Sequence, residues 1–552
     1  MEKIWIKTYP PGVPAEISID HIASLVTVFE DACRKYADQV AYISMDREMT
    51  YGELDRLSRD FAGWLQSLGM VKGDRVALMM PNLLQYPVAL FGTLRAGCVV
   101  VNVNPLYTPR ELEHQLKDSG AKAIVIVENF AHTLEQVIAK TGVKHVVVTP
   151  MGDLLGMIKG TLVNFVVRHV KKMVPAWSLP GSININAALA AGRRHGAEPV
   201  KLSHDDLAFL QYTGGTTGVS KGAMLTHGNI ASNVMQAHAW IKPVVVEGKE
   251  VVVTPLPLYH IFALTVSLTF LMVGGRNLLI ANPRDIAGFV KEWGKYPISV
   301  ATGVNTLFKG LLNHPDFAAL DFTTMKVSLG GGTAVQAPVA ERWQKVTKSP
   351  LLQAYGLTET SPAATINPLD LKEFNGSIGL PISSTELSIR DDAGKELAVG
   401  EIGEICIRGP QVRMGYWQRP EETANVMYAD GFLRTGDMGY VDSLGFFFIV
   451  DRKKDMILVS GFNVYPNEIE EVVAMHEGVG DVAAIGVPDD NTGEAVKIFV
   501  VRKDPNLTPE EIIAHCRKHL TGSKVPKQVE FRPDLPRTNV GKILRRALKE
   551  GA

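Results

Sequence analysis

Short apolar runs alternate with longer helix-like stretches in the first third of the chain. Between Arg75 and Pro150 the runs are RVALMMP, CVVVNVNP, KAIVIV and HVVVTP, and residues 83–96 are typical of the helix-like stretches between them. Strands that alternate with helices usually form a parallel sheet that the helices cover. The pattern therefore predicts an α/β subdomain.

The same alternation returns at Leu207, which indicates a second parallel-sheet subdomain. Its apolar runs are LAFLQYT, VVVTPL, ISVATGV, KVSLGGG and LLQAYG, and they end in loops rich in Gly or Thr. Ligands of open α/β sheets bind beyond the carboxyl ends of the strands. We therefore expect these loops to form a binding site.

The pattern changes after about residue 375. Short alternating strands with Gly turns follow, as in SIGLPISSTELSIRDDAGKELAVGEIGEICIRGP, and they predict a small antiparallel barrel or sheet. Beyond FFFIVDRKKD come a helix over 467–476, two strands and a second helix that opens on the capping box Thr508 to Glu511. The expected fold is an α/β N-terminal domain over 1–450, a connection over 451–454 and a small α+β domain over 455–552.

Composition narrows the function classes. The 552 residues carry a formal net charge of -1, which excludes the broad cationic surface that sequence-independent nucleic-acid binding requires. The four cysteines form no CxxC pair, so neither a zinc ribbon nor a disulfide framework is indicated. The first residues, MEKIWIKTYPPGVP, lack the apolar stretch of a signal peptide. The sequence therefore predicts a cytoplasmic protein.

The segment YTGGTTGVSKGAMLTH, Tyr212 to His227, has the strongest chemical signal. It leaves a predicted strand and enters a helix near Asn229, and its glycines and hydroxyl residues can surround phosphate oxygens while Lys221 adds a cation. No GxxxxGK[ST] pattern of the Walker A loop is present. The alternative is a flexible Gly-rich turn without a ligand.

This segment resembles the phosphate-binding loop of the adenylate-forming superfamily of acyl-CoA synthetases, peptide-synthetase adenylation domains and luciferases. Further similar segments follow in the family's order: PLYH, GGG, YGLTE, RTGD, DRKKD, SGFNVYPNEIE and PRTNVGK. The chain is most similar to bacterial long-chain fatty acyl-CoA synthetases, notably in VALMMPNLLQYPVALFG and NPLYTPRELEHQL. The resemblance implies ATP, Mg²⁺ and coenzyme A as cofactors and a fatty acid as substrate.

The resemblance also implies roles for individual residues. The phosphate loop would comprise Thr213, Gly214, Gly215, Thr216, Thr217, Gly218 and Lys221; the adenine and ribose sites Gly330, Gly331, Gly332, Tyr355, Gly356, Asp437 and Arg452; and the coenzyme A side Ser460 and Gly461. Glu359, with Thr213, would bind magnesium, and Thr358 would contact the α-phosphate. Taken singly, each of these residues has an ordinary structural explanation, such as a packed tyrosine or a solvated glutamate.

Three more residues complete the implied mechanism. Lys542 matches the lysine that bridges the substrate carboxylate and the α-phosphate during adenylation. Lys454 matches the hinge about which a mobile C-terminal domain rotates between the two half-reactions, although a plain charged linker has the same composition. His260 matches a residue at the junction of acyl group and phosphate, where a buried structural histidine is the alternative.

Two segments are compatible with lipid. The apolar stretch from Ile261 to Gly275 is shorter than the roughly 18 residues of a membrane-spanning helix and is a candidate wall of an acyl tunnel. Residues 154–197 contain six Lys or Arg and no acid, and MIKGTLVNFVVRHVKKMVPAW reads as a basic amphipathic helix that could lie on an anionic membrane. This predicts a peripheral location at the inner face of the cell membrane, and the resemblance is compatible with a homodimer.

Rival functions stay open at this point. A medium-chain or aryl acid:CoA ligase would share the motifs, as would a fatty acyl-AMP ligase that serves a carrier protein, and an inactive nucleotide-binding sensor could keep the fold. Thr333 and Ala334 follow the triple glycine where long-chain enzymes commonly carry a Met-Pro or Ala-Pro pair, which leaves the preferred chain length undecided. Ser220 replaces the proline that many family members have before the loop lysine.

Overall fold

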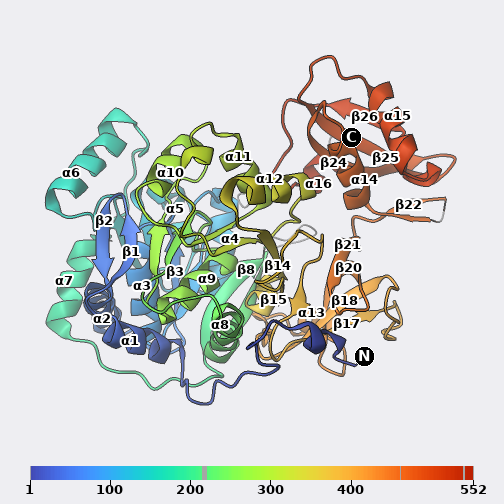
Figure 1. The fold of residues 1–552 in the computed structure, drawn as a ribbon. Coiled ribbons are helices and arrows are strands. Elements are labelled where there is room, and N and C mark those ends of the chain that lie inside the picture. Colours follow the sequence, from blue (N-terminus) through green and yellow to red (C-terminus); the bar gives the residue numbers. More distant parts are fainter. Residues whose placement is uncertain (1, 214–219, 461, 539–540, 551–552) are drawn as a thin grey trace.

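A computed structural model of the chain describes residues 2–213, 220–460, 462–538 and 541–550. Two large sheets, a small antiparallel sheet and a separate C-terminal unit make up the molecule (Figure 1). The first large sheet has the strand order β19 (Gly415–Tyr416), β9 (Lys221–Thr226), β8 (Leu207–Thr213), β4 (Val99–Asn102), β3 (Arg75–Met79), β5 (Ala123–Val127), β6 (His145–Thr149) and β7 (Ile183–Asn184).

The second large sheet has nine strands. Their order is β16 (Leu380–Pro381), β15 (Ala363–Ile366), β14 (Leu351–Gly356), β13 (Val327–Gly330), β12 (Val300–Gly303), β10 (Val251–Thr254), β11 (Arg276–Leu279), β1 (Val40–Ser44) and β2 (Arg47–Thr50). Strands from β14 to β1 run parallel, and the outer strands β2, β15 and β16 are antiparallel. The two predicted parallel sheets are thus confirmed, with antiparallel edges that the apolar runs did not indicate.

Helices cover these sheets and bury the apolar faces of the strands. They are α1 (Leu25–Lys35), α2 (Tyr51–Ser67), α3 (Gln85–Arg95), α4 (Pro109–Ser119), α5 (Ala131–Glu135), α7 (Ile185–His195), α8 (His227–Ile241), α9 (Ile261–Met272), α10 (Ile286–Trp293), α11 (Asn305–Asn313) and α12 (Ala337–Thr347). Helix α6 (Met157–Phe165) lies instead at the edge of the molecule and buries only Gly160 (Figure 1). The strands β3 to β5 are almost wholly buried, because helices lie on both of their faces. None of the helices in the described ranges is both long and apolar enough to cross a membrane.

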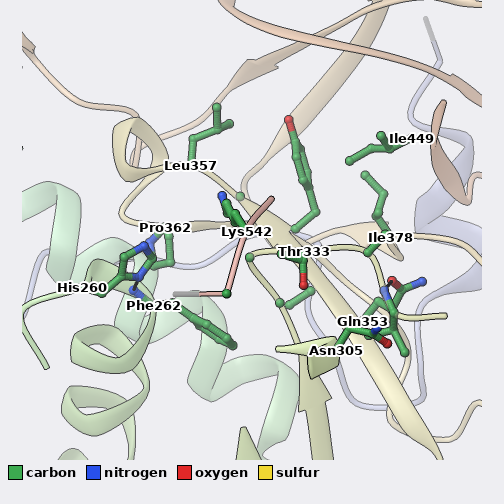
Figure 2. Close-up of a pocket in the computed structure, with 18 of the residues that line it drawn as sticks. His260, Phe262, Asn305, Thr333, Gln353, Leu357, Pro362, Ile378, Ile449 and Lys542 are labelled. Atoms are coloured by element: carbon green, nitrogen blue, oxygen red, sulfur yellow. Dashed lines mark hydrogen bonds between the residues drawn. The ribbon is translucent and has the colours of Figure 1, made fainter. Parts of the chain in front are cut away.

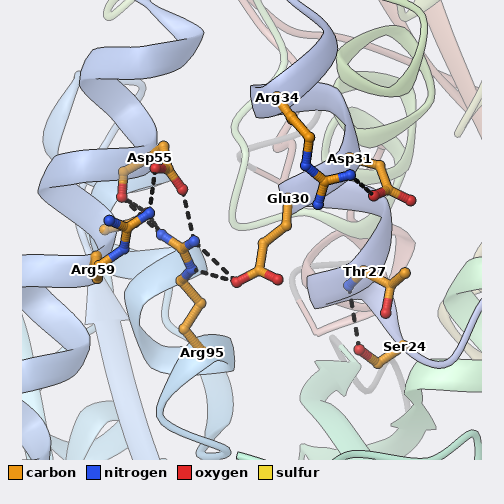
Figure 3. Close-up of polar contacts among 9 residues, drawn as sticks. Ser24, Thr27, Glu30, Asp31, Arg34, Asp55, Arg59 and Arg95 are labelled. Atoms are coloured by element: carbon orange, nitrogen blue, oxygen red, sulfur yellow. Dashed lines mark hydrogen bonds and ion pairs between the residues drawn. The ribbon is translucent and has the colours of Figure 1, made fainter. Parts of the chain in front are cut away.

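Charged side chains connect the first three helices. Arg95 at the end of α3 is almost fully buried and binds Asp55 of α2 at 2.6 Å and Glu30 of α1 at 2.9 Å (Figure 3). Its guanidinium also donates to the Asp55 carbonyl at 2.7 Å and lies over the Phe29 ring. A fork of several donors suits such a site, where one cation satisfies two carboxylates and a carbonyl. The cluster fixes the relative positions of α1, α2 and α3.

The predicted antiparallel barrel is a four-stranded sheet, β17 (Glu386–Arg390), β18 (Gly403–Arg408), β20 (Leu433–Val441) and β21 (Phe447–Arg452), flanked by α13 (Pro420–Asn425). The N-terminal segment packs on it. Trp5 is 2% exposed and contacts Phe447 edge-on, and a Cβ atom at Gly445 would approach the Trp5 backbone to 2.4 Å. The start of the chain is therefore part of this subdomain's core.

The C-terminal unit is a small α+β structure, as predicted. Its strands are β22 (Ile457–Val459), β23 (Phe462–Val464), β24 (Val479–Asp489), β25 (Gly493–Arg502) and β26 (Gln528–Phe531), and its helices are α14 (Pro466–Ala474), α15 (Pro509–His519) and α16 (Arg545–Lys549). Thr508 and Glu511 form the predicted capping box of α15. The unit joins the rest of the chain through residues 453–456, between β21 and β22, and lies beside the antiparallel sheet (Figure 1).

The segment from Tyr212 to His227 leads from strand β8 to a helix near Asn229, as predicted: α8 begins at His227, where Thr226 caps it. The sequence did not indicate the strand between them. Residues 221–226 form β9, which pairs antiparallel with β8 on one side and with β19 on the other. Ala223 and Leu225 are fully buried, so β9 packs one face on the core like its neighbours.

Candidate active site

A cavity of about 1620 Å³ lies where the loops of both large sheets, the antiparallel sheet and the C-terminal unit meet. Most of the candidate residues from the sequence line it. They are Thr213, Lys221, His260, Gly331, Gly332, Tyr355, Gly356, Thr358, Glu359, Asp437, Arg452, Lys454 and Lys542. Residues up to 329 positions apart in the sequence, Thr213 and Lys542, therefore share one site. It lies at the carboxyl ends of β8, β13 and β14, as expected for such sheets.

Asp437 is the centre of a hydrogen-bonded cluster. Tyr355 at the end of β14 donates its phenol hydrogen to Asp437 Oδ2 at 2.6 Å, and Arg452 Nε lies 2.6 Å from Oδ1. Arg452 is held opposite by the pairing of β20 with β21. Burial raises the pKa of Asp437, and the charge of Arg452 opposes that shift. The cluster joins two different sheets and presents an aromatic ring, a carboxylate and a guanidinium side by side.

At the end of β13 the chain approaches neighbouring atoms too closely for larger side chains at the three glycines 330–332, or bends in a way that favours glycine. A Cβ atom at Gly331 would lie 3.0 Å from the Phe262 ring and 3.3 Å from the Ala354 carbonyl oxygen, and one at Gly330 would lie 2.4 Å from Val335. Gly332 has a φ of 76°, in the left-handed region that favours glycine. Gly331 and Gly332 line the cavity, whereas Gly330 does not. The result is a side-chain-free backbone next to Tyr355.

Glu359 lies in a short 3-10 turn, Thr358–Thr360, between β14 and β15. Tyr416 donates its phenol hydrogen to Glu359 Oε1 at 2.6 Å, which leaves Oε2 free of that bond. Thr213 at the end of β8 and Thr358 add hydroxyl oxygens to the cavity wall. Oxygen donors of this kind fit Mg²⁺, which usually takes one or two carboxylates and completes its shell with water and substrate phosphates. Among the residues that the structure describes, no group of three or more His, Cys, Asp or Glu side chains could hold a metal ion.

The ends of the Gly-rich loop are well defined. Ser220 Oγ donates to the Thr213 carbonyl at 2.6 Å, which closes the hairpin, and Lys221 forms an ion pair with Glu422 while its ammonium lies 5.5 Å from the centre of the Tyr416 ring. The predicted phosphate contacts Gly214, Gly215, Thr216, Thr217 and Gly218, and the predicted coenzyme A contact Gly461, lie outside the described residues.

Lys542 enters the cavity from the C-terminal unit. Figure 2 shows its side chain between His260 and Leu357 on one side and Thr333 on the other. The loop that carries it is shaped by Thr538, whose N–H donates to the Lys542 carbonyl at 2.7 Å, and by Arg537, which donates to the Gly541 carbonyl at 2.7 Å. Burial and the neighbouring Arg452 lower the pKa of Lys542. A cation held in this way gains stability when an anion enters.

His260 caps helix α9, because its Nδ1 accepts a hydrogen bond from Phe262 N at 3.3 Å. Burial, with a smaller contribution from the charge of Lys542, lowers the pKa of His260 to about 4. The imidazole is therefore neutral near pH 7. It can exchange hydrogen bonds with a ligand but adds no positive charge to the site.

Contacts across the domain boundary fix the C-terminal unit in this orientation. The backbone N–H of Asn467 donates to Asp451 Oδ2 at 2.7 Å, and Lys309 of α11 donates to the Gly480 carbonyl at 2.5 Å. Lys454, the predicted hinge, lines the cavity, and burial lowers its pKa. Ser460 lies instead in the exposed turn between β22 and β23 and does not line the cavity.

An apolar arm extends from the site between α8 and α9. Phe262, Val266 and Phe270 lie on one face of α9 with Thr265 and Thr269, and the distance along the helix from 262 to 270 is about 12 Å. Both threonine hydroxyls donate to backbone carbonyls at 2.8 Å, so their polar groups are satisfied. Opposite lie Ala237, Ile241, Val300, Val327, Leu329 and Leu369. The predicted tunnel wall thus faces a cavity over two turns of helix.

Sequence reasoning missed several residues of this site. Tyr416 and Arg413 contact Glu359 from a segment, GPQVRMGYW, whose residues carry no spacing that points to the cavity. Arg545 was also missed; it is bonded to Glu470 at 2.8 Å and to Asn467 at 3.0 Å, three residues after Lys542. Only its position in a basic C-terminal segment could have drawn attention to it.

The site can be compared with known proteins. Residues 29–417 match the family described as AMP-binding enzyme, and residues 468–542 match the AMP-binding enzyme C-terminal domain. Over its full length the chain is 60% identical to a long-chain-fatty-acid–CoA ligase of Yersinia pestis, of which it covers 98%, and 60% identical to one of Escherichia coli O157:H7, of which it covers 99%.

A solved structure shows a similar fold and supports the assignment of the architecture. The crystal structure of ATP-bound MatB from Rhodopseudomonas palustris is similar with a TM-score of 0.81 and 29% identity, over 95% of this chain and 98% of that one.

Proposed function

The chain belongs to the AMP-binding enzyme family of AMP-forming acid–CoA ligases, and on that basis we propose that it joins long-chain fatty acids to coenzyme A. The acid first attacks the α-phosphorus of ATP, which gives acyl-AMP and pyrophosphate. The thiol of coenzyme A then attacks the acyl carbon and AMP leaves. The names of the two full-length relatives support the substrate class.

One observation carries the proposal: Lys542 lies in the same cavity as Glu359 and Asp437, next to an apolar arm. A carboxylate that attacks a triphosphate brings two anions together, so a cation between them lowers the barrier. Lys542 is the residue that would supply it. Burial and the charge of Arg452 lower the pKa of Lys542, so an anion beside its ammonium would stabilise the charged form.

The other residues would bind and orient the nucleotide. The Tyr355 ring and the bare backbone at Gly331 suit a flat base, and the Asp437 carboxylate can accept hydrogen bonds from ribose hydroxyls on its remaining lone pairs. Glu359 with Thr213 would hold Mg²⁺, which would neutralise phosphate charge when bound. His260, neutral at pH 7, would stay a hydrogen-bonding neighbour of the carboxylate.

The second half-reaction needs space where Lys542 now lies. In this orientation Ser460 is exposed and remote from the cavity. We propose that the C-terminal unit rotates at Lys454, which withdraws Lys542 and brings the turn at 460 to the site. The rotation would break hydrogen bonds that cross the boundary, which include those of Asn467 with Asp451 and Val450 and that of Lys309 with Gly480. Hinge rotations of this type need only a few residues to change their backbone angles.

The apolar arm supports a long acyl chain. Burial of a methylene is worth about 0.8 kcal/mol, so roughly 14 methylenes give on the order of 11 kcal/mol as an upper bound. An aryl acid would leave much of the arm between Ala237 and Phe270 without contacts. This favours the fatty substrate over the aryl rival.

A panel of acids tests the proposal. Purified protein is incubated with ATP, Mg²⁺, coenzyme A and acids from acetate through octanoate, palmitate and oleate to coumarate, and pyrophosphate and acyl-CoA are measured separately. We expect both products, with the highest kcat/KM for long chains. Highest activity with coumarate or octanoate would show that the substrate is an aryl or a medium-chain acid. Pyrophosphate without thioester would indicate a ligase that serves a carrier protein. If no acid released pyrophosphate, the proposed enzymatic activity would be refuted.

We also propose that α6 brings the enzyme to anionic membrane surfaces. Met157 and Ile158 are each 88% exposed and Leu162 is 61% exposed, on a helix at the edge of the molecule (Figure 1). Lys171 and Lys172 follow α6 in the sequence and supply cations, whereas Lys159 and Arg168 are paired with Asp46 and Glu128. A helix with exposed apolar residues and adjacent cations can bind at the interface of an anionic bilayer.

Vesicle sedimentation tests this membrane contact. The protein should sediment with vesicles that contain phosphatidylglycerol, less with pure phosphatidylcholine, and less still as the variant Ile158→Glu. Val71→Glu is the matched control, because Val71 is an equally isolated apolar residue, 61% exposed, elsewhere on the surface. Equal binding by both variants, or no binding by the wild type at low salt, would refute the role of α6.

A further inference from the structure

A tyrosine and an arginine that have no role in the scheme above surround Glu359. Tyr416 donates its phenol hydrogen to Glu359 Oε1 at 2.6 Å, and the backbone N–H of Arg413 donates to the Glu359 carbonyl at 2.8 Å. Both residues belong to the segment 413–417, and Glu359 lies more than fifty residues earlier in the chain. This segment therefore holds the glutamate by its side chain and by its backbone.

The segment is itself fixed to the strand that follows the Gly-rich loop. Strand β19 pairs with β9, with Tyr416 opposite Ala223, and Trp417 N donates to the Gly222 carbonyl at 2.8 Å. The Lys221 ammonium lies over the Tyr416 ring. Tyr416 thus contacts both the candidate metal ligand and the lysine of the phosphate loop.

Arg413 is unusual in its surroundings. It is 4% exposed, and in the described ranges its Nε and Nη2 are buried without a hydrogen-bond partner. Its guanidinium carbon lies 3.8 Å from the centre of the Tyr416 ring. A buried charge with unsatisfied donors is costly to a fold. The segment that carries Arg413 contacts the carboxylate of Glu359 through Tyr416.

Arg413 and Glu359 meet at the two functional parts of Tyr416. The guanidinium of Arg413 lies over the ring, and the hydroxyl of the same ring donates to Glu359. A cation on the ring face withdraws electron density from the phenol and strengthens that hydrogen bond.

We propose that Tyr416 and Arg413 are positioning residues for the metal: Tyr416 fixes one oxygen of Glu359 and turns the other toward Mg²⁺–ATP, and the charge of Arg413 on the Tyr416 ring strengthens this bond. The inference rests on the proposed function, because it needs Mg²⁺ at Glu359. The fit of Glu359 is a matter of donor chemistry: its Oε2 is the hard oxygen that the Tyr416 bond leaves available.

Calorimetric titration of ATP with Mg²⁺ and with EDTA tests the proposal without turnover. The wild type should bind ATP more tightly with Mg²⁺. Tyr416→Phe should lose about tenfold of this metal-dependent gain, because it loses a hydrogen bond to a charged group, and its binding in EDTA should not change. Tyr428→Phe is the control, since the Tyr428 hydroxyl is buried and has no partner in the described ranges.

Two further variants separate positioning from folding. Arg413→Met should raise the melting temperature, because it removes an unsatisfied buried charge, yet it should reduce the metal-dependent gain. The double variant Tyr416→Phe with Glu359→Gln should lose no more of the gain than Glu359→Gln alone, since Tyr416 acts through Glu359.

The outcomes are distinct. A wild type whose ATP affinity does not respond to Mg²⁺ would refute the metal site of the proposed function. If Mg²⁺ increases the ATP affinity of the wild type, and the gain is the same in Tyr416→Phe as in Tyr428→Phe, the positioning role is overturned. Additive losses in the double variant, or lower thermal stability of Arg413→Met together with unchanged metal dependence, would also overturn it and leave the two residues with a structural role alone.

Discussion

The apolar arm gives the sharpest prediction about substrate choice. Ala237 on α8 lines the arm opposite α9 and is only partly buried, so a larger side chain there would project into existing space. Ala237→Phe should shorten the acyl chain that the arm accepts. The fold should tolerate the change, because the ring fills a cavity and displaces no packed neighbour.

The magnitude follows from the buried surface. A phenyl ring whose burial is worth roughly 1.5–3 kcal/mol takes the space of roughly two to four methylenes at about 0.8 kcal/mol each. The kcat/KM for palmitate should therefore fall about 10- to 150-fold, while octanoate, which does not reach the deep part of the arm, should lose less than about threefold.

The assay is acyl-CoA formation at subsaturating acid for octanoate, laurate and palmitate. His238→Phe is the control: it places the same ring one position further on α8, at a residue that does not line the cavity. Equal losses for octanoate and palmitate would mean that Ala237 faces the nucleotide side, and an unchanged palmitate value would mean that the chain does not enter the arm. Either result would refute this assignment of the acyl site.

Three other predictions concern charges. Lys542→Ala should slow pyrophosphate release about 10²- to 10³-fold but leave thioester formation from supplied acyl-AMP nearly unchanged; equal losses would contradict the two-orientation scheme. The kcat/KM of the wild type should fall as the pH rises, and the midpoint of this fall should lie below pH 10.5, because burial lowers the pKa of Lys542 and its neutral form is inactive. Any residual activity of Lys542→Arg should not show this fall. Arg95→Met should destabilise the N-terminal part by about 1–2 kcal/mol, since Asp55 and Glu30 lose their partner but stay partly hydrated; an unchanged melting curve would count against a structural role of this cluster.

Much of the fold could be predicted because local patterns were strong. The run LAFLQYT is strand β8 over the predicted residues, LLQAYG is β14, and α15 begins at its predicted capping box. Several antiparallel strands were missed because their pairing depends on distant partners. Lys221 to Thr226 forms β9 only since β8 and the short β19 lie beside it, and periodicity in one segment does not report such neighbours.

Some residues of the site could be predicted from the sequence and others could not. Lys542, Asp437 and Glu359 were indicated by motif resemblance, and the structure brings their side chains to one cavity although they lie up to 183 residues apart. Tyr416 and Arg413 could not be found in the sequence, because their importance comes from contacts with Glu359 that only the tertiary structure creates. Side chains that support a ligand-binding residue rarely carry a sequence signal of their own.

A single-turnover experiment tests the central claim most directly. Enzyme in excess over palmitate is mixed with ATP and Mg²⁺ without coenzyme A, quenched at intervals, and analysed for pyrophosphate and palmitoyl-AMP. Adenylation in this cavity predicts equal amounts of both products before coenzyme A is added. Addition of coenzyme A should then convert the palmitoyl-AMP to palmitoyl-CoA and AMP and leave the amount of pyrophosphate unchanged. Release of ADP and phosphate, or no palmitoyl-AMP until coenzyme A is present, would contradict it.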